Sequence, residues 1–156
     1  MSKVEDFLTK AEEQEIVEAI GVAEKNTSGE IRVHIEKGPS LKGELAKQNT
    51  IAPIDRAMEV FRQLQMENTQ ERNGVIIYVA VKSKHFAIYG DKGINEKVDD
   101  NFWDSTKEVM QNHFQSGNFK QGLIDGILKA GEQLQKHFPH ADDDTNELSN
   151  EISIGE

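Results

Sequence analysis

Three short segments of the chain have the hydrophobic patterns of β-strands. In residues 30–36, apolar and polar positions alternate strictly, and this period of two predicts a strand with one buried face. Residues 75–81 form an unbroken apolar run, which is typical of a strand covered on both faces. After a polar turn at 82–84, residues 85–90 are predicted to return as its antiparallel partner.

Four longer segments have apolar residues at helical spacing, and they cover residues 9–25, 53–66, 95–115 and 118–137. Thr9 and Glu12 have the spacing of a capping box at the start of the first helix. Gly117 separates the last two helices. Residues 37–50 are predicted to form a loop, since they contain two glycines and a proline.

The order of these elements predicts an α/β fold, a mixed β-sheet of three to four strands sandwiched between α-helices. A right-handed crossover between the first two strands would make them parallel. From Pro139 onward the periodic pattern ends. We therefore expect one α/β domain over residues 1–138 and an acidic, disordered tail over residues 139–156.

Most of the net charge of −10 comes from the predicted tail. Residues 139–156 hold six acidic residues and no Lys or Arg, which leaves about −4 for residues 1–138. Binding to nucleic acid or to anionic lipid needs clustered cations, so we expect neither as a partner. No apolar run approaches the ~20 residues of a membrane span, and the acidic N-terminus does not resemble a signal peptide. With no cysteine present, these features predict a cytoplasmic protein without disulfides.

The predicted topology gathers acidic residues at one end of the sheet. The first two strands start there and the antiparallel third strand finishes there, beside Gly90-Asp91-Lys92-Gly93. A hard cation such as Ca²⁺ takes 6–8 oxygen ligands. Glu30, Asp91, Asp99 and Asp100 are the candidate ligands for Ca²⁺, with Mg²⁺ or another divalent cation as alternatives. In the competing interpretation Asp91 caps a turn, and Asp99 and Asp100 only favour the first turn of a helix.

The opposite end of the sheet is predicted to be basic, with four lysines that could hold a phosphate: Lys37, Lys42, Lys82 and Lys84. An ordinary solvated hairpin turn explains Lys82 and Lys84 equally well. The five histidines show no spacing typical of a zinc site. Only His34 and Glu36, at alternate positions on one strand face, form a pair worth testing. Sequence motifs of hydrolases, of nucleotide-binding loops and of cysteine phosphatases are missing.

Five segments stand out as an ordered set of motifs: Thr27-Ser28-Gly29-Glu30-Ile31-Arg32-Val33, Arg72-Asn73-Gly74-Val75-Ile76-Ile77-Tyr78-Val79-Ala80, Phe86-Ala87-Ile88-Tyr89-Gly90-Asp91-Lys92-Gly93-Ile94, the segment 119–123 and Asn146-Glu147-Leu148. Together they resemble the TPM-domain family, named after thylakoid-lumen, photosystem-repair and receptor-associated members. The resemblance implies a sheet between helices and acidic sites that hold calcium in some members. Gly90, Asp91, Gly93 and Asp100 match the family's glycine-rich turn and the aspartate after it, and Glu30 matches the opening of its first strand motif.

The resemblance also implies a weak acid phosphatase activity for part of the family. In this chain, Val81-Lys82 stand where many members have two acids at the end of the second strand. Three hypotheses follow. The first is a non-catalytic domain that binds divalent cations and has a regulatory or protein-interaction role, the second a module that binds an unidentified protein, and the third a weak metal-assisted phosphatase.

Overall fold

The computed structural model describes residues 8–36, 53–68, 72–81, 85–99, 101–139 and 152–154. The sheet has four strands in the order β3-β2-β1-β4. They are β1 (Glu30–Glu36), β2 (Gly74–Ala80), β3 (His85–Gly90) and β4 (Ser153–Ile154). β1 is parallel to β2 and to β4, and β3 is antiparallel to β2. The predicted mixed sheet and its parallel first pair are therefore confirmed.

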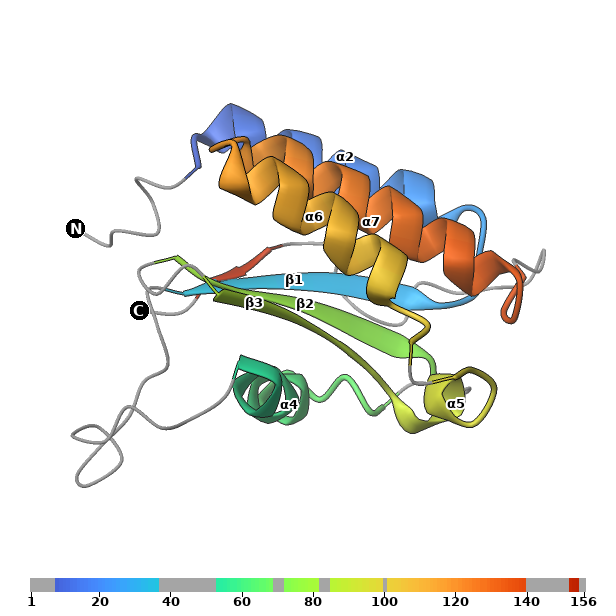
Figure 1. The fold of residues 1–156 in the computed structure, drawn as a ribbon. Helices are drawn as coiled ribbons and strands as arrows, with labels where there is room; N and C mark the ends of the chain where they lie inside the picture. The colour runs from blue at the N-terminus through green and yellow to red at the C-terminus, as the bar shows by residue number, and fades with distance from the viewer. Residues whose placement is uncertain are drawn as a thin grey trace, which may run out of the picture.

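Helices cover both faces of this sheet (Figure 1). One face carries α2 (Lys10–Glu24), α6 (Asp104–Gln115) and α7 (Phe119–Gln135), and the other carries α4 (Pro53–Gln63). The short α5 (Lys92–Asn95) follows β3 at one end of the sheet. Among the described residues these layers form the predicted α/β sandwich, so the fold class is confirmed.

Two apolar cores lie on either side of the sheet. The larger one joins Ile31, Val33 and Ile35 of β1 to α2, α6 and α7, and the smaller one joins Ile76 and Tyr78 of β2 to α4. The alternation in β1 was predicted to leave its polar face exposed. This prediction is wrong, because every residue of β1 except Arg32 is buried, and Arg56 of α4 bonds to Glu36 on the second face.

The predicted helix over residues 95–115 is split in the structure. α5 ends at Asn95, a turn region follows, and α6 begins at Asp104. Ile94 and Trp103 are both buried in the larger core. We attribute the break to these two anchors, because tertiary burial outweighs the local helical periodicity between them. The other predicted helices and strands differ from the observed ones by three residues at most at either end.

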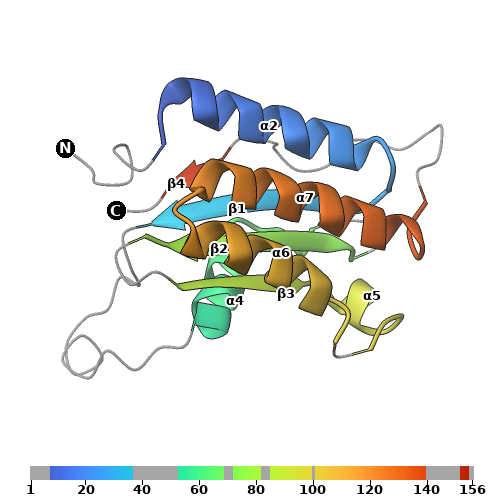
Figure 2. The ribbon, with the colours of Figure 1, turned by 45° about the horizontal axis from the view of Figure 1, so that its top comes forward.

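The end of the chain returns to the sheet. Pro139 forms an isolated bridge with Thr27, and Ser153–Ile154 form β4 on the outer edge of β1 (Figure 2). The segment 139–156 was expected to lack regular structure, and β4 is a difference from that expectation. A strand of two residues has no hydrophobic period that sequence patterns could reveal. The predicted loop 37–50 lies outside the described residues.

Candidate functional site

The strand register brings Glu30 and Asp91 to the same end and the same face of the sheet. Glu30 pairs with Gly74 on the neighbouring strand. On the far side of Gly74, the Asp91 N–H donates to the Gly74 carbonyl at 2.9 Å, which continues the ladder beyond β3. Two strand spacings put the Cα atoms of Glu30 and Asp91 about 10 Å apart. Because residues two apart on a strand share a face, Asp91 lies with Tyr89 on the face that carries α4.

Gly74, which pairs with Glu30 and bonds to Asp91, contributes no side chain between these two carboxylates. Glu30 and Asp91 are both buried, at 3 % and 1 % exposure. A carboxylate is rarely buried to this extent unless it is paired or hydrogen-bonded. We call Glu30, Gly74 and Asp91 the acidic row.

Asp91 is held by Arg72 and by the start of α5. Arg72 donates through Nε to Oδ2 of Asp91 at 2.8 Å and through a terminal nitrogen to Oδ1 at 3.1 Å. Oδ1 also accepts from the Lys92 N–H at 2.7 Å, as the N-cap of α5. The hydrogen bond to Asp91 raises the pKa of Arg72 above its usual value. The capping interpretation of Asp91 therefore holds, and the carboxylate already has a cationic partner that the sequence analysis missed.

The backbone of Arg72 lies in the left-handed region, with φ of 52°. Residues other than glycine rarely adopt this conformation. Here it is fixed from two directions, since the Arg72 carbonyl accepts from the Gly93 N–H at 2.9 Å and its guanidinium binds Asp91. Backbone strain of this kind concentrates at functional sites.

Within the described residues, the structure shows no contact between the acidic row and the other two predicted ligands, Asp99 and Asp100. Asp99 is exposed in the turn region after α5, and its carbonyl accepts from the Phe102 N–H at 3.1 Å. Asp100 lies outside the described residues, as do Lys37, Lys42, Lys82 and Lys84 of the predicted basic end. Across the part of the chain that the structure describes, no three His, Asp or Glu side chains are grouped as metal ligands. The predicted cation site thus stays a prediction.

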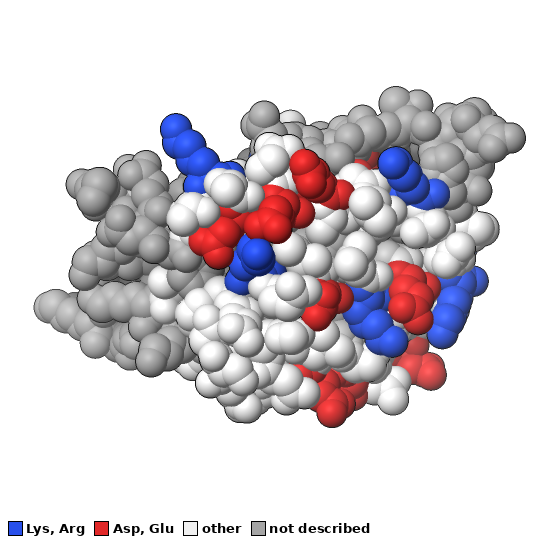
Figure 3. Space-filling model, turned by 90° about the horizontal axis from the view of Figure 1, so that it is seen from above, with Lys and Arg blue, Asp and Glu red and all other residues white. Residues whose placement is uncertain are grey.

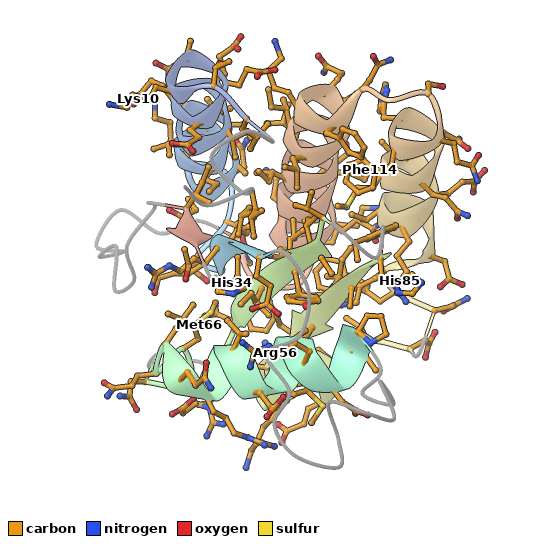
Figure 4. The ribbon with its side chains drawn as sticks, turned by 90° about the vertical axis from the view of Figure 1, so that its left-hand side faces the viewer. Lys10, His34, Arg56, Met66, His85 and Phe114 are labelled. Carbon is orange, nitrogen blue, oxygen red and sulfur yellow. The ribbon has the colours of Figure 1, made fainter. Side chains whose placement is uncertain are left out.

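A second polar cluster lies between α4 and the sheet, at the opposite end of β1. Glu36 accepts from Nε2 of His34 at 2.9 Å, from Arg56 at 2.9 Å through two nitrogens, and from the Tyr78 hydroxyl at 2.6 Å. Figure 4 shows Arg56 reaching from α4 toward the sheet strand that carries His34. Nδ1 of His34 lies 2.8 Å from the Ser153 hydroxyl of β4. We call these five residues the Glu36 network.

Burial alone would raise the pKa of Glu36, but the hydrogen bonds from His34, Arg56 and Tyr78 outweigh it and lower this pKa to about 2. Burial, followed by the bond to Glu36, raises the pKa of Tyr78 well above its usual value. Glu36 is therefore ionised and Tyr78 stays protonated at neutral pH. Both oxygens of Glu36 already accept two bonds each, so this carboxylate is a structural centre rather than an open metal ligand.

The sequence pattern indicated only part of this network. His34 and Glu36 were recognised as a pair on one strand face, and both side chains are buried, at 6 % and 1 % exposure. Arg56 and Tyr78 were missed because they come from other elements. The one available signal was a tyrosine within the otherwise apolar run of β2.

A hollow of about 590 Å³ opens beyond the carboxyl end of β2. Its apolar wall includes Phe86, Phe114 and Phe119, whose rings contact one another in sequence at 5.2 and 5.6 Å between centroids. None of its described lining residues is acidic. Over the described residues of the helical face, acidic and basic side chains are interspersed (Figure 3). The acidic row is therefore the better candidate for a cation site.

Comparison with known proteins identifies the class of this domain. The family profile described as TPM domain matches residues 1–133. The chain therefore belongs to the TPM-domain family, which confirms the resemblance. No curated protein sequence matches it. Among the described residues, no helix is long and apolar enough to cross a membrane.

Solved structures agree with this assignment. The chain is 57 % identical to the BA42 protein of the psychrophilic bacterium Bizionia argentinensis, with a TM-score of 0.86 and coverage of 99 % of this chain and 100 % of that one. An N-terminal domain from P. gingivalis shares the fold at 19 % identity and a TM-score of 0.65, covering 86 % and 82 % of the two chains. The N-terminal domain of cg2496 from Corynebacterium glutamicum does so at 10 % and 0.59, covering 96 % and 80 %.

Proposed function

We propose that this TPM domain binds a divalent cation, of the Ca²⁺ type, at the acidic row. One observation carries the proposal: Glu30 and Asp91 occupy the same face and the same end of the sheet, on either side of Gly74. A glutamate and an aspartate can reach one ion across this gap from their two strands. The candidates for further oxygen ligands are Asp99, in the turn region after α5, and Asp100, which lies outside the described residues, with water completing the 6–8 that Ca²⁺ takes.

The ion pair between Arg72 and Asp91 supports the proposal by the chemistry it represents. A planar guanidinium that binds both oxygens of a carboxylate stands where a cation would bind. A divalent ion must therefore displace Arg72, and the Arg72 side chain is free to leave because 43 % of its surface is exposed. Its left-handed backbone can relax once the guanidinium is released.

This competition gives the domain a regulatory role rather than a catalytic one. Binding of the ion would release a positive side chain to the surface beside α5 and neutralise the acidic row. The change in surface charge is then what a partner protein would detect. Mg²⁺ demands a tighter octahedral site than two carboxylates on separate strands provide, so Ca²⁺ is the ion we expect to be preferred.

Thermal unfolding with and without the ion tests the proposal. An ion that binds only the folded state stabilises it by ~2.7 kcal/mol at a hundredfold excess over its Kd. We expect Ca²⁺ to raise the melting temperature, a chelator to reverse the rise, and Asp91→Asn to abolish it. Asp104→Asn, at the exposed start of α6, is the matched control and should keep the full response. Identical melting temperatures in millimolar Ca²⁺ and in chelator would rule the proposal out.

A further inference from the structure

The hollow beyond the carboxyl end of β2 lies at the opposite end of the sheet from the acidic row. β1 and β2 run parallel, and His85 at the start of β3 pairs with Ala80 at the end of β2. Figure 4 looks onto this end of the sheet and labels His85 and Phe114 there. Ligands of α/β proteins favour the carboxyl ends of parallel strands, and a volume of about 590 Å³ is within the range of small-molecule sites. The hollow therefore has the position and the size of a ligand-binding pocket.

The turn from α6 to α7 forms one wall of this pocket and is fixed by its own hydrogen bonds. Gly117 has a φ of 81°, a left-handed conformation that glycine adopts without a steric cost. The Gly117 N–H donates to the Phe114 carbonyl at 3.1 Å, and the Asn118 N–H donates to the His113 carbonyl at 2.9 Å. These bonds satisfy carbonyls of the last turn of α6. The wall is therefore pre-formed, which lowers the cost of ordering it around a ligand.

Three half-buried phenylalanines give the pocket its aromatic surface. The ring of Phe114 lies edge-on to Phe86 at 5.2 Å between centroids, and it lies 5.6 Å from the ring of Phe119. The Phe114 ring also packs against bare backbone of α7, where a Cβ at Gly122 would lie only 2.6 Å from its Cε1. Contacts with both neighbouring rings and with α7 thus fix the orientation of the Phe114 ring. Aromatic side chains bind other flat rings by offset stacking or edge-to-face contact, so a planar ring suits this surface.

The polar groups of the pocket indicate the hydrogen-bonding edge of the ligand. Gln111 and Gln115 line it from one side of α6, since they are four residues apart, and both are exposed. Among the described residues, no hydrogen bond uses either amide. A side-chain amide both donates and accepts, and glutamine pairs in this bidentate way with N6 and N7 of adenine. The described lining contains no Lys, Arg, Asp or Glu, so an ionic group would lose its hydration here without a compensating charge.

We propose that this pocket binds an uncharged planar heterocycle of the adenine type, with the ring against Phe114 and its donor–acceptor edge on Gln111 and Gln115. The aromatic surface accepts flat rings in general, and the two amides select among them by their hydrogen-bonding groups. This site goes beyond the proposed cation binding and does not depend on it, because the acidic row lies at the other end of β1 and β2.

The test is an amide NMR titration of the full-length chain with adenine and with purine, the same ring system without the amino group. We expect a Kd of about 1 mM for adenine, an affinity that its roughly ten non-hydrogen atoms reach at a modest efficiency per atom. The shifts should centre on the lining residues Val81, Phe86 and Gly117 and be the same in a chelator. Purine should bind ~5-fold more weakly, the effect of one lost hydrogen bond. No saturation by ~5 mM adenine, equal affinities for the two compounds, or shifts only outside the pocket would overturn the proposal.

Three variants assign the contacts within the pocket. Gln111→Ala combined with Gln115→Ala changes exposed positions only, and this chain should lose the preference for adenine over purine. Phe114→Leu should weaken the binding of both compounds ~10-fold, because the stacking surface is lost. Asn112→Ala is the control, since Asn112 is exposed on the same helix and lies outside the pocket lining, and it should bind like the unsubstituted chain. A preference for adenine that survives in the glutamine variant, or unchanged binding in Phe114→Leu, would contradict the proposed arrangement of the ligand.

Discussion

Arg72 binds Asp91 through two hydrogen bonds while its own backbone stands in a left-handed conformation. The pair links the residue that precedes β2 to the residue that caps α5. Removing the guanidinium would therefore affect two properties at once, the charge on Asp91 and the strain at position 72. A glycine there accepts the same φ without a steric cost, so Arg72→Gly removes the charge and the backbone strain together. Gln65→Gly, at the other non-glycine residue with positive φ among those described, then controls for the backbone change.

The packing of α2 against α7 makes a prediction about two helical glycines. A Cβ at Gly131 of α7 would lie 2.8 Å from the Ala23 Cβ and 3.1 Å from its Cα, and the backbone of α2 cannot move aside as a flexible side chain would. Gly131→Ala should lower the free energy of unfolding by ~1–3 kcal/mol.

Gly21 of α2 is the matched control, since a Cβ there meets nothing within 4 Å. Gly21→Ala should raise the free energy of unfolding by ~0.5–1 kcal/mol, because alanine has the higher helix propensity. Denaturant unfolding of the two variants checks both signs. Equal effects in the two variants would contradict the close approach of the helices.

The Glu36 network predicts a specific dependence of stability on pH. The pKa of Glu36 is lowered from 4.5 to about 2 in the folded protein, so an unfolded chain takes up this proton first as the pH falls. The stability from Glu36 is therefore complete above about pH 4.5 and is lost as the pH falls toward about 2. Glu36→Gln should be less stable at neutral pH, and its difference from the unsubstituted protein should shrink by about 2 kcal/mol between pH 6 and pH 2.5.

Glu59→Gln is the control for this titration, because Glu59 is 48 % exposed and lies 3.8 Å from Arg56 at the rim of the same cluster. Its unfolding free energy should follow that of the unsubstituted protein at every pH within ~0.5 kcal/mol. Parallel pH profiles of Glu36→Gln and the unsubstituted protein would mean that Glu36 titrates normally in the fold.

Tyr78 donates the shortest of the bonds to Glu36, at 2.6 Å. Tyr78→Phe removes this donor from a buried carboxylate and should cost about 2 kcal/mol of unfolding free energy. It should also shift acid unfolding to higher pH, since one of the bonds that lower the pKa of Glu36 is lost. Tyr89→Phe is the matched change on the same sheet face, where Tyr89 packs edge-on against Phe61, and it should change the stability by less than ~0.5 kcal/mol. Denaturant unfolding at two pH values distinguishes the outcomes.

Sequence patterns predicted the fold well where one physical requirement dominates a whole segment. The alternation in β1, the apolar run of β2 and the capping box at Thr9 each depend on neighbours in the chain. Sequence patterns failed where tertiary contacts determine the local structure. The predicted helix over residues 95–115 breaks because Ile94 and Trp103 are both anchored in the larger core.

The candidate site was predictable in position but not in its partners. Topology alone placed Glu30 and Asp91 at one end of the sheet, since parallel and antiparallel strands determine which ends meet. The pairing of Asp91 with Arg72 depends on a left-handed residue that no periodic pattern reveals. The cover of β1's second face by Arg56 and Tyr78 was missed for a similar reason, because both residues reach Glu36 from elements distant in sequence.

A Ca²⁺ titration followed by amide NMR on the unsubstituted chain, Arg72→Gly and Gln65→Gly tests the account most directly. Gln65 also has a positive φ, of 58°, so its glycine variant controls for the backbone change alone. If a cation and Arg72 compete for Asp91, Arg72→Gly should bind Ca²⁺ about fivefold more tightly than either other chain, the factor expected for an ion pair whose cationic partner is partly exposed. The shifts should centre on Glu30, Gly74 and Asp91. Equal affinities in all three chains, or shifts elsewhere only, would contradict a cation site at the acidic row.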